Sequence, residues 1–316
     1  MANFFTVPYL FVLLGGISDF SLDFINSYSN KSKYQSNYKA FRAMLNKKLC
    51  LTIGDPVFHS KGPTIKTMSC QLLGISDEYS FIPYQTDLNI DGEIAKLKQF
   101  IIDNNVAGMS VTMPNKQAVI QMCDEIDEST KFMNAVNTVA VKNGKLFGYN
   151  TDWIGVVGAL KGVTNLDGKK IAILGSGGTT SATLYGLTKD TKNITVFNRT
   201  IEKAKNLAEK FGVNYDLIDN INVENFDIII NTTSVGFDNE NESPIDTSKI
   251  SAKNIVFDVI YKPMETKLLR DAKQNGAEII YVINVLLYGT FPQVKFYTGH
   301  ELSQEQMKKI SDFFAK

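Results

Sequence analysis

The stretch IAILGSGGTTS, residues 171–181, decides the fold. Its first four residues are apolar and predict a buried strand, and Gly175, Gly177 and Gly178 follow directly, ahead of a segment with helical character. Gly175 permits a tight turn, Gly177 lets a ligand approach the backbone, and the helix N-terminus offers N–H donors to an anion. The pattern predicts a Rossmann-type unit that binds a dinucleotide, with Thr180 where the motif usually places a third small residue.

The next strand distinguishes between the two nicotinamide dinucleotides. It ends about 20 residues after the glycines, where an NAD site typically carries Asp or Glu for the ribose hydroxyls. Asn198, Arg199 and Thr200 stand there instead. A carboxylate would repel a 2′-phosphate, whereas the guanidinium attracts it and can hydrogen-bond it. The sequence therefore predicts NADP as the cofactor, held by these cofactor-binding residues: Gly175, Ser176, Gly177, Gly178, Thr179, Asn198, Arg199 and Thr200.

Strands and helices are expected to alternate along both halves of the chain, which indicates α/β domains with mostly parallel sheets. In the C-terminal half, the periodicity predicts strands 170–174, 193–198, 226–231, 254–260 and 278–283, and helices 179–188, 201–211 and 265–275. In the N-terminal half, it predicts strands 48–54, 78–85 and 108–113, helices 63–74, 91–105, 116–123 and 152–162, and a hairpin at 138–150 turning at Asn143-Gly144.

The length of 316 residues favours two domains. A substrate-binding catalytic domain is expected at 47–152 and a Rossmann NADP-binding domain at 153–299. The helical pattern at 300–316 is expected to pack back on the first domain. Residues 1–46 are interpreted as an extension of unknown role, which packs on the body of the protein or mediates self-association.

The composition argues against several kinds of partner. The 33 basic and 33 acidic residues cancel, so no overall field gathers nucleic acid or an anionic membrane. Two histidines and three cysteines without CxxC spacing argue against a metal site and favour reduced thiols. The apolar run at 4–14 is too short to span a bilayer and has no basic segment before it. We therefore expect a cytoplasmic protein, monomeric or homodimeric, that acts on a small molecule.

Four polar clusters lie at the ends of predicted strands in the first domain: HSKG (59–62), SVTMPNK (110–116), NAVNT (134–138) and GYNTD (148–152). Together with GSGGT and NRT, they resemble the shikimate dehydrogenase family in order and spacing, over about residues 48–300. The resemblance implies an NADP-dependent oxidoreductase of aromatic amino acid biosynthesis, which interconverts 3-dehydroshikimate and shikimate.

By this resemblance, Lys116 is the catalytic lysine and Asp152 is its partner. Such a pair suits the chemistry, because hydride reduction of a ketone leaves an alkoxide that must receive a proton, and the reverse reaction must remove it. A lysine beside a carboxylate can hydrogen-bond the reacting oxygen and transfer that proton. Taken alone, a Lys and an Asp more commonly form a surface ion pair; the surrounding motifs favour the catalytic role.

The resemblance also implies that Ser60, Thr112, Asn137 and Tyr261 bind the substrate, and that Val259 lies near the nicotinamide. The substrate-binding set consists of hydroxyls, an amide and a phenol, which suit a polyhydroxylated ring acid. Without the resemblance, turn or cap chemistry would explain Thr112 and Asn137 equally well.

The chain departs from the family in the predicted substrate pocket. Gly62 stands where the family usually has a second serine that binds the substrate carboxylate. Near the C-terminus, Val282 and Asn284 stand at the places of two glycines, and Gly289 at the place of a glutamine that contacts substrate. Each lost polar contact costs about 1–3 kcal/mol unless another residue replaces it. We therefore expect weak binding of shikimate.

Several alternatives stay open on the sequence. Gln293 or Tyr288 are candidates for replacing the lost contacts. The altered pocket also fits a paralogue that acts on quinate or an aminated analogue. Methylenetetrahydrofolate dehydrogenase shares the two-domain plan and also uses a lysine, but the HSKG and NTD motifs argue against it. A non-catalytic NADP-binding regulator would have no need of Lys116 and Asp152.

Overall fold

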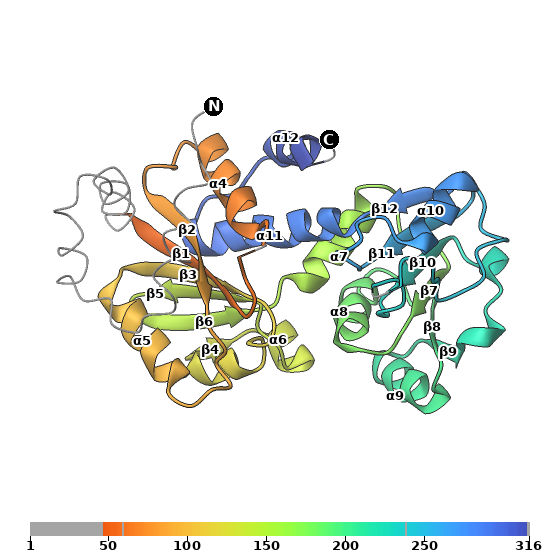
Figure 1. The fold of residues 1–316 in the computed structure, drawn as a ribbon, viewed down its shortest axis with the longest axis horizontal. Helices are drawn as coiled ribbons and strands as arrows, with labels where there is room; N and C mark the ends of the chain where they lie inside the picture. The colour runs from red at the N-terminus through yellow and green to blue at the C-terminus, as the bar shows by residue number, and fades with distance from the viewer. Residues whose placement is uncertain (1–46, 59, 238, 315–316) are drawn as a thin grey trace. The chain divides into compact units, whose positions relative to one another are not determined.

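The computed structural model describes residues 47–58, 60–237 and 239–314, which form two compact units (Figure 1). The first unit contains the described residues up to Asn150 together with those from Thr290 onward, and the second contains Thr151–Gly289. The N-terminal extension expected at 1–46 lies outside the described residues.

The border between the units differs from the one expected from the sequence. Residues 290–299 are assigned to the second domain by the sequence, but the structure groups them with the first unit, and it groups Thr151 and Asp152, expected in the first domain, with the second unit. The division falls within one continuous helix, α11 (Val282–Thr298), so no loop or change of composition marks it in the sequence.

The first unit is built on a mixed six-stranded sheet with the order β2-β1-β3-β5-β6-β4. Its strands are β1 (Lys48–Gly54), β2 (Tyr79–Gln85), β3 (Val106–Val111), β4 (Glu125–Ile126), β5 (Thr138–Lys142) and β6 (Lys145–Tyr149). β1 pairs in parallel with β2 and β3, whereas β5 runs antiparallel to β3 and β6. The β5–β6 hairpin turns at Asn143 and Gly144 with φ values of 52° and 75°, as their sequence predicts.

Helices cover both faces of this sheet. On one face, Leu49 and Leu51 of β1 pack in a cluster with residues of α5 (Glu93–Asp103) and of the 3₁₀ helix η2 (Ala118–Met122). On the other face, Cys50 packs with Cys70 of α4 (Gly62–Leu73) and Tyr297 of α11. This alternation is the period of two that a strand buried on both faces requires.

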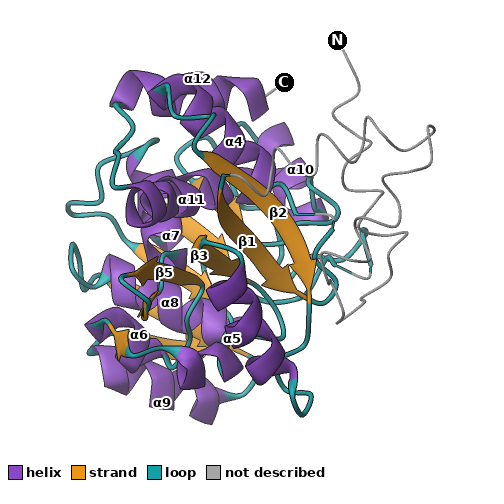
Figure 2. Ribbon diagram, turned by 90° about the vertical axis from the view of Figure 1, so that its left-hand side faces the viewer, coloured by secondary structure: helices purple, strands orange, loops and turns teal. Residues whose placement is uncertain are grey.

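Two further helices complete the first unit. The short α6 (Glu128–Met133) precedes β5, and α12 (Gln304–Phe314) lies against α4 (Figure 2). The side-chain Nε2 of Gln306 in α12 donates to the carbonyl of Leu72 at 2.8 Å, which links the C-terminal helix to α4.

The second unit contains a six-stranded sheet with the order β12-β11-β10-β7-β8-β9, in which every strand pair is parallel. The strands are β7 (Ile171–Leu174), β8 (Ile194–Asn198), β9 (Asn214–Leu217), β10 (Ile228–Asn231), β11 (Ile255–Asp258) and β12 (Glu278–Ile280). The helices of this unit are α7 (Asp152–Lys161), α8 (Gly178–Leu187), α9 (Ile201–Phe211) and α10 (Lys267–Gln274), with short 3₁₀ turns η3 (Ile218–Asn220) and η4 (Val223–Asn225). This is the doubly wound Rossmann order, so the predicted fold class is confirmed.

The sequence-based elements are wrong at two places. The predicted helix 116–123 is a short 3₁₀ helix, and the predicted strand 278–283 ends at Ile280, after which α11 begins. α11 begins with the mostly apolar stretch 282–288 and includes Pro292, so its helical period is hidden. β4, α6 and β9 are also absent from the prediction, because elements this short carry too little periodicity.

Candidate active site

The predicted substrate-binding residues of the first unit lie at one edge of its sheet. Ser60 follows β1, Thr112 and Lys116 follow β3, and Asn137 directly precedes β5. Because β1 and β3 are parallel and β5 is antiparallel to β3, these ends meet at the same edge. The Val111 N–H donates to the Asn137 carbonyl at 2.7 Å, which joins two of these segments directly.

Gly54 lets the loop after β3 approach the end of β1. A Cβ atom at Gly54 would lie 2.3 Å from Thr112 Cγ2 and 2.9 Å from the Met113 carbonyl, distances that no side chain tolerates. The glycine at the end of the strand therefore permits the close packing of Thr112, which is half-buried at this edge.

Asn115 holds the Lys116 loop in place, although the sequence analysis did not single it out. Its buried side chain accepts from the Leu88 N–H at 2.7 Å and donates to the Thr86 carbonyl at 2.7 Å. On the next residue, the Lys116 carbonyl accepts from the Val136 N–H at 2.8 Å. Lys116 itself is half-buried. The sequence did contain a signal for the importance of Asn115, because this residue follows a predicted strand and directly precedes the predicted catalytic lysine.

Gln293 supports Asn137 from α11. The Gln293 Nε2 donates to the Thr138 hydroxyl at 3.1 Å, and Thr138 donates to Asn137 Oδ1 at 2.7 Å. This relay fixes the orientation of the Asn137 amide, and Gln293 and Asn137 are both buried. Gln293 is therefore linked to a predicted substrate residue through one hydroxyl, although it is not at the family's glutamine position.

Tyr288, the other candidate replacement, packs within the second unit. A Cβ atom at Gly158 of α7 would lie 2.8 Å from the Tyr288 ring, and one at Gly162 would lie 2.9 Å from its hydroxyl oxygen. Gly289, at the family's glutamine place, also contacts α7: its added Cβ would lie 3.3 Å from the Thr151 carbonyl. Glycine at 289 therefore serves the close packing of α11 on α7.

The glycine turn of the second unit has the geometry of a phosphate-binding turn. Gly175 has φ 110°, and a Cβ there would lie 2.8 Å from the Thr232 hydroxyl oxygen, so both backbone conformation and space require glycine. By contrast, an added Cβ at Gly177 or Gly178 meets no atom within 4 Å. Those two glycines leave open space above the N-terminus of α8, where first-turn N–H groups lack intrahelical acceptors.

Thr180 stabilises the glycine turn through two hydrogen bonds of its side chain. Its buried hydroxyl accepts from the Gly177 N–H at 3.1 Å and bonds the Thr232 hydroxyl at 2.7 Å. Thr180, which stands where the motif usually places a third small residue, thus stabilises the turn. Thr232 was not singled out from the sequence, although its place directly after β10, in the polar run NTTS, was a usable signal.

Asn198 is the last residue of β8, and Arg199 and Thr200 connect this strand to α9. The Asn198 Nδ2 donates to the Thr200 carbonyl at 3.1 Å, and Arg199 and Thr200 are exposed. The guanidinium therefore stands in solvent next to the N-terminus of α9, which begins at Ile201. A cation and a helix N-terminus together suit a phosphate.

The end of β11 is organised by a buried carboxylate. Asp258 is completely buried and accepts from three donors: the Ile260 N–H at 3.0 Å, the Thr266 hydroxyl at 2.7 Å and Asn231 Nδ2 at 3.1 Å. Burial raises the pKa of Asp258, and these hydrogen bonds oppose the rise. Asp258 directly precedes Val259 and thus fixes the segment that leads to Tyr261. Burial also raises the pKa of Tyr261.

The predicted residues of the second unit meet along the carboxyl edge of its sheet. The Gly175 N–H donates to the Phe197 carbonyl at 2.7 Å, and the Val259 N–H donates to the Asn231 carbonyl at 3.1 Å. The first bond joins the end of β7 to β8, and the second joins the end of β11 to β10. Asp152 is the first residue of α7, and a carboxylate is favourable at that helix end.

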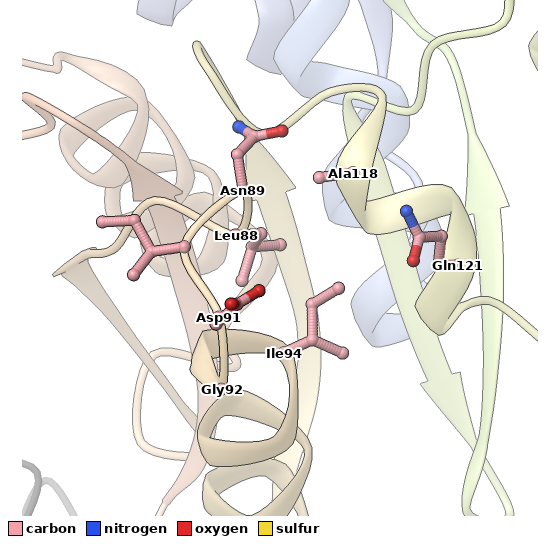
Figure 3. A pocket seen from close by; sticks show the side chains of 8 residues that line it. Leu88, Asn89, Asp91, Gly92, Ile94, Ala118 and Gln121 are labelled. Atoms are coloured by element: carbon pink, nitrogen blue, oxygen red, sulfur yellow. The ribbon is translucent and has the colours of Figure 1, made fainter.

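A hollow elsewhere in the first unit is lined by none of the predicted residues. It encloses about 310 Å³ between the start of α5 and η2, with Leu88, Asp91 and Gln121 among its lining residues (Figure 3).

Within the described part of the chain, no three His, Cys, Asp or Glu side chains are grouped to hold a metal ion. No described helix is long and apolar enough to cross a membrane.

The parallel sheet of the second unit, with a glycine turn at the point where its strand order reverses, defines a dinucleotide-binding α/β protein. Residues 52–139 match the family model described as shikimate dehydrogenase substrate binding domain, and residues 158–259 match the one described as shikimate / quinate 5-dehydrogenase. The chain belongs to the shikimate dehydrogenase family.

Individual relatives agree with this assignment. The chain is 39% identical over 279 residues to a shikimate dehydrogenase (NADP(+)) of Methanococcus maripaludis, covering 84% of this chain and 98% of the relative. A crystal structure of a shikimate dehydrogenase in complex with NADP+ is similar with a TM-score of 0.74 and 33% identity, over 85% of this chain and 96% of the other. A 5-ketofructose reductase from a Gluconobacter species has a TM-score of 0.74 and 26% identity, over 85% and 99%.

Proposed function

We propose that the protein is an NADP-dependent shikimate dehydrogenase that reversibly reduces 3-dehydroshikimate to shikimate. The observation that carries this proposal is the glycine turn of the second unit followed by Arg199, in a chain related to NADP-dependent shikimate dehydrogenases. The relationship extends over 98% of the Methanococcus relative, so it includes the substrate-binding half as well as the nucleotide-binding half.

The nucleotide-binding residues fit NADP chemically. The open space at Gly177 and Gly178 suits the pyrophosphate, and the exposed Arg199 at the start of α9 suits the 2′-phosphate. Ser176, Thr179, Asn198 and Thr200 add polar groups around these two places. Bound NADPH supplies the hydride for the reduction of the ketone carbon.

Lys116 and Asp152 are proposed as the acid-base pair. Lys116 donates a proton to the carbonyl oxygen as it gains negative charge, and accepts the hydroxyl proton in the reverse direction. Asp152 is assigned the role of orienting the ammonium and favouring its charged form. The buried Asn115 keeps the backbone of the Lys116 loop fixed, which supports a defined position for this proton transfer.

Ser60, Thr112, Asn137 and Tyr261 are proposed to bind the substrate. Three of them, in the first unit, lie at one sheet edge with Lys116. Val259 is proposed to lie near the nicotinamide. Quinate or an aminated analogue is the second candidate substrate, because the chain departs from the family at Gly62 and Gly289 in the predicted pocket.

We further propose that the enzyme works in the cytoplasm as a monomer or homodimer, on small molecules and without nucleic acid. The balance of 33 basic and 33 acidic residues supports the last point. Light scattering coupled to size-exclusion chromatography tests the oligomeric state.

Turnover assays test the proposed function. Shikimate and quinate are each supplied with NADP and with NAD, and reduced dinucleotide is followed by its absorbance. We expect the highest kcat/KM for shikimate with NADP. A preference for quinate would move the protein to the second candidate substrate. Binding of NADP without turnover of either acid would favour the non-catalytic regulator.

A further inference from the structure

A buried lysine that the proposed reaction does not use lies next to Gly62. Lys66 of α4 is only 1% exposed, and its Nζ donates to the Ser110 hydroxyl of β3 at 2.8 Å. Among the described residues this is its one hydrogen bond, and no carboxylate pairs with it. An ammonium carries three N–H donors, so two of them have no acceptor in the described chain.

The surroundings of Lys66 are otherwise neutral. Cys50 of β1, Cys70 of α4 and Tyr297 of α11 pack on this face of the sheet, and burial raises the pKa of each of these three groups. Ser110 also approaches the Thr52 hydroxyl at 3.1 Å. None of these groups supplies the negative charge that would offset the burial of an ammonium, which costs several kcal/mol when it is unpaired.

Gly62 opens the space between Lys66 and Ser60. A Cβ atom at Gly62 would lie 3.3 Å from Lys66 Nζ and 3.3 Å from Ser60 Oγ. A side chain at this position would contact both the ammonium and the hydroxyl. The Ser60 oxygen accepts from the Gly62 N–H at 3.2 Å, so the hydroxyl proton is available to a second acceptor.

We infer that Lys66 and Ser60 together bind the carboxylate of the substrate, with Gly62 leaving the room that the ammonium needs to reach it. The inference rests on the proposed function and specifies its substrate class, a hydroxylated ring acid. A carboxylate accepts several hydrogen bonds and supplies the missing negative charge. The Lys66 ammonium then takes the place of the serine hydroxyl that the family has at position 62. We therefore expect firm binding of shikimate, in place of the weak binding expected from the sequence.

Burial also lowers the pKa of Lys66 to about 8. The side chain is therefore still mostly protonated at neutral pH, and its positive charge can attract an anion. If Lys66 had only a packing role, its unpaired charge would destabilise the fold with no benefit. A methionine would fill a similar volume without the cost of burying a charge.

The test compares Lys66→Met with the wild-type chain on two ligands, shikimate and its methyl ester, which lacks the negative charge. Lys96→Met, an exposed lysine of α5, is the matched control. Isothermal titration calorimetry without dinucleotide measures binding, and thermal unfolding checks that each variant is folded. A charge-assisted contact of this kind gives roughly a tenfold to hundredfold change in Kd.

We expect Lys66→Met to raise the Kd for shikimate at least about tenfold and to leave the Kd for the ester nearly unchanged. Lys66→Arg, which keeps the charge, should retain part of the preference for the acid. Lys96→Met should bind both ligands as the wild type does. The wild type should bind 5-ketofructose, a sugar without a carboxylate, weakly.

Two results would overturn the inference. One is a wild-type Kd for shikimate no lower than that of folded Lys66→Met. The other is an equal loss of affinity for the acid and its ester in Lys66→Met. Both are read from binding alone. If Lys66 governs acid binding but the wild type fails to oxidise shikimate with NADP, the proposed function fails while the carboxylate site stands.

Discussion

Thr180 donates its hydroxyl proton to Thr232 across 2.7 Å, and this bond fixes the phosphate-binding turn. The direction follows from the neighbours: Thr232 bonds the Leu174 carbonyl at 2.6 Å, and a carbonyl only accepts. Thr232 has one proton, so Thr180 must donate to it and can accept from the Gly177 N–H at 3.1 Å. The three bonds link the glycine turn to the end of β7 through Thr232, in the loop after β10, so side chains of the protein itself hold the turn.

The first prediction concerns this chain of bonds. Thr180→Val keeps the shape of the side chain but leaves the Gly177 N–H without its acceptor. We expect a loss of about 1–2 kcal/mol in the free energy of unfolding and a several-fold higher Kd for NADP. Thr188→Val is the control, because it removes a threonine hydroxyl that donates to the Leu184 carbonyl at the other end of α8. Chemical denaturation and NADP titration provide the two readouts. Equal Kd values in the two variants would contradict a role for Thr180 in the turn.

The second prediction concerns dinucleotide choice. Arg199→Asp replaces an attractive charge by a repulsive one at the start of α9. The KM for NADP should rise at least about tenfold, whereas the KM for NAD should change little. Lys210→Asp makes the same change of charge at the far end of α9 and should affect both dinucleotides weakly. An unchanged KM for NADP in Arg199→Asp would exclude this residue from the 2′-phosphate site.

The third prediction concerns proton transfer. Lys116→Ala should lower kcat by about 10² or more, because general acid-base groups typically contribute that much. The Kd for NADP should stay within about twofold. Lys131→Ala, an exposed lysine in the last turn of α6, serves as the control and should keep full activity. Full activity of Lys116→Ala would instead assign the proton transfer to Asp152 or to water.

The fourth prediction is a pH dependence caused by Lys66. Its pKa is lowered from 10.5 to about 8 in the folded protein, so between these values the unfolded chain binds more protons. Stability therefore rises with pH across that window, by roughly 1–3 kcal/mol from this residue. The nearby thiols of Cys50 and Cys70 and the phenol of Tyr297 have raised pKa values and stay neutral at the start of the window.

The measurement is the difference in free energy of unfolding between wild type and Lys66→Met, taken at pH 7.5 and near pH 10 by urea denaturation. The difference should move in favour of the wild type at the higher pH, because the penalty of the buried charge disappears. The Kd of the wild type for shikimate should rise over the same range, since the neutral amine attracts the carboxylate less. A difference that is flat with pH would show that Lys66 titrates normally.

The fifth prediction concerns Gly289. An added Cβ would lie 3.3 Å from the Thr151 carbonyl, so that carbonyl must shift by a few tenths of an ångström to admit even alanine, and 3.7 Å from Gly155 Cα. Gly289→Ala should cost about 1–3 kcal/mol of stability. Restoring the family's glutamine at 289 should therefore destabilise the protein rather than improve binding of shikimate. Thermal unfolding checks this, and an unchanged midpoint for Gly289→Ala would refute the packing argument.

Local patterns of the sequence predict the nucleotide-binding unit well. The apolar strand, the glycines and the following helix are adjacent in the chain, so Gly175, Gly177 and Gly178 are found without tertiary information. Arg199 is found in the same way, because it follows the next strand along. Thr232 is not found, because its bond to Thr180 joins positions 52 residues apart. α11 is missed because its apolar run hides the helical period.

The sequence by itself determined the fold class, the family, and the residue types that suit hydride transfer with NADP, because these depend on short motifs in a fixed order. Only the tertiary structure decided what replaces the serine lost at Gly62. Lys66 lies four residues further along, one helical turn away, yet its chemistry depends on β1, β3 and α11, which exclude water and provide no counter-charge. Burial and the absence of a partner are properties of packing, and no local pattern encodes them.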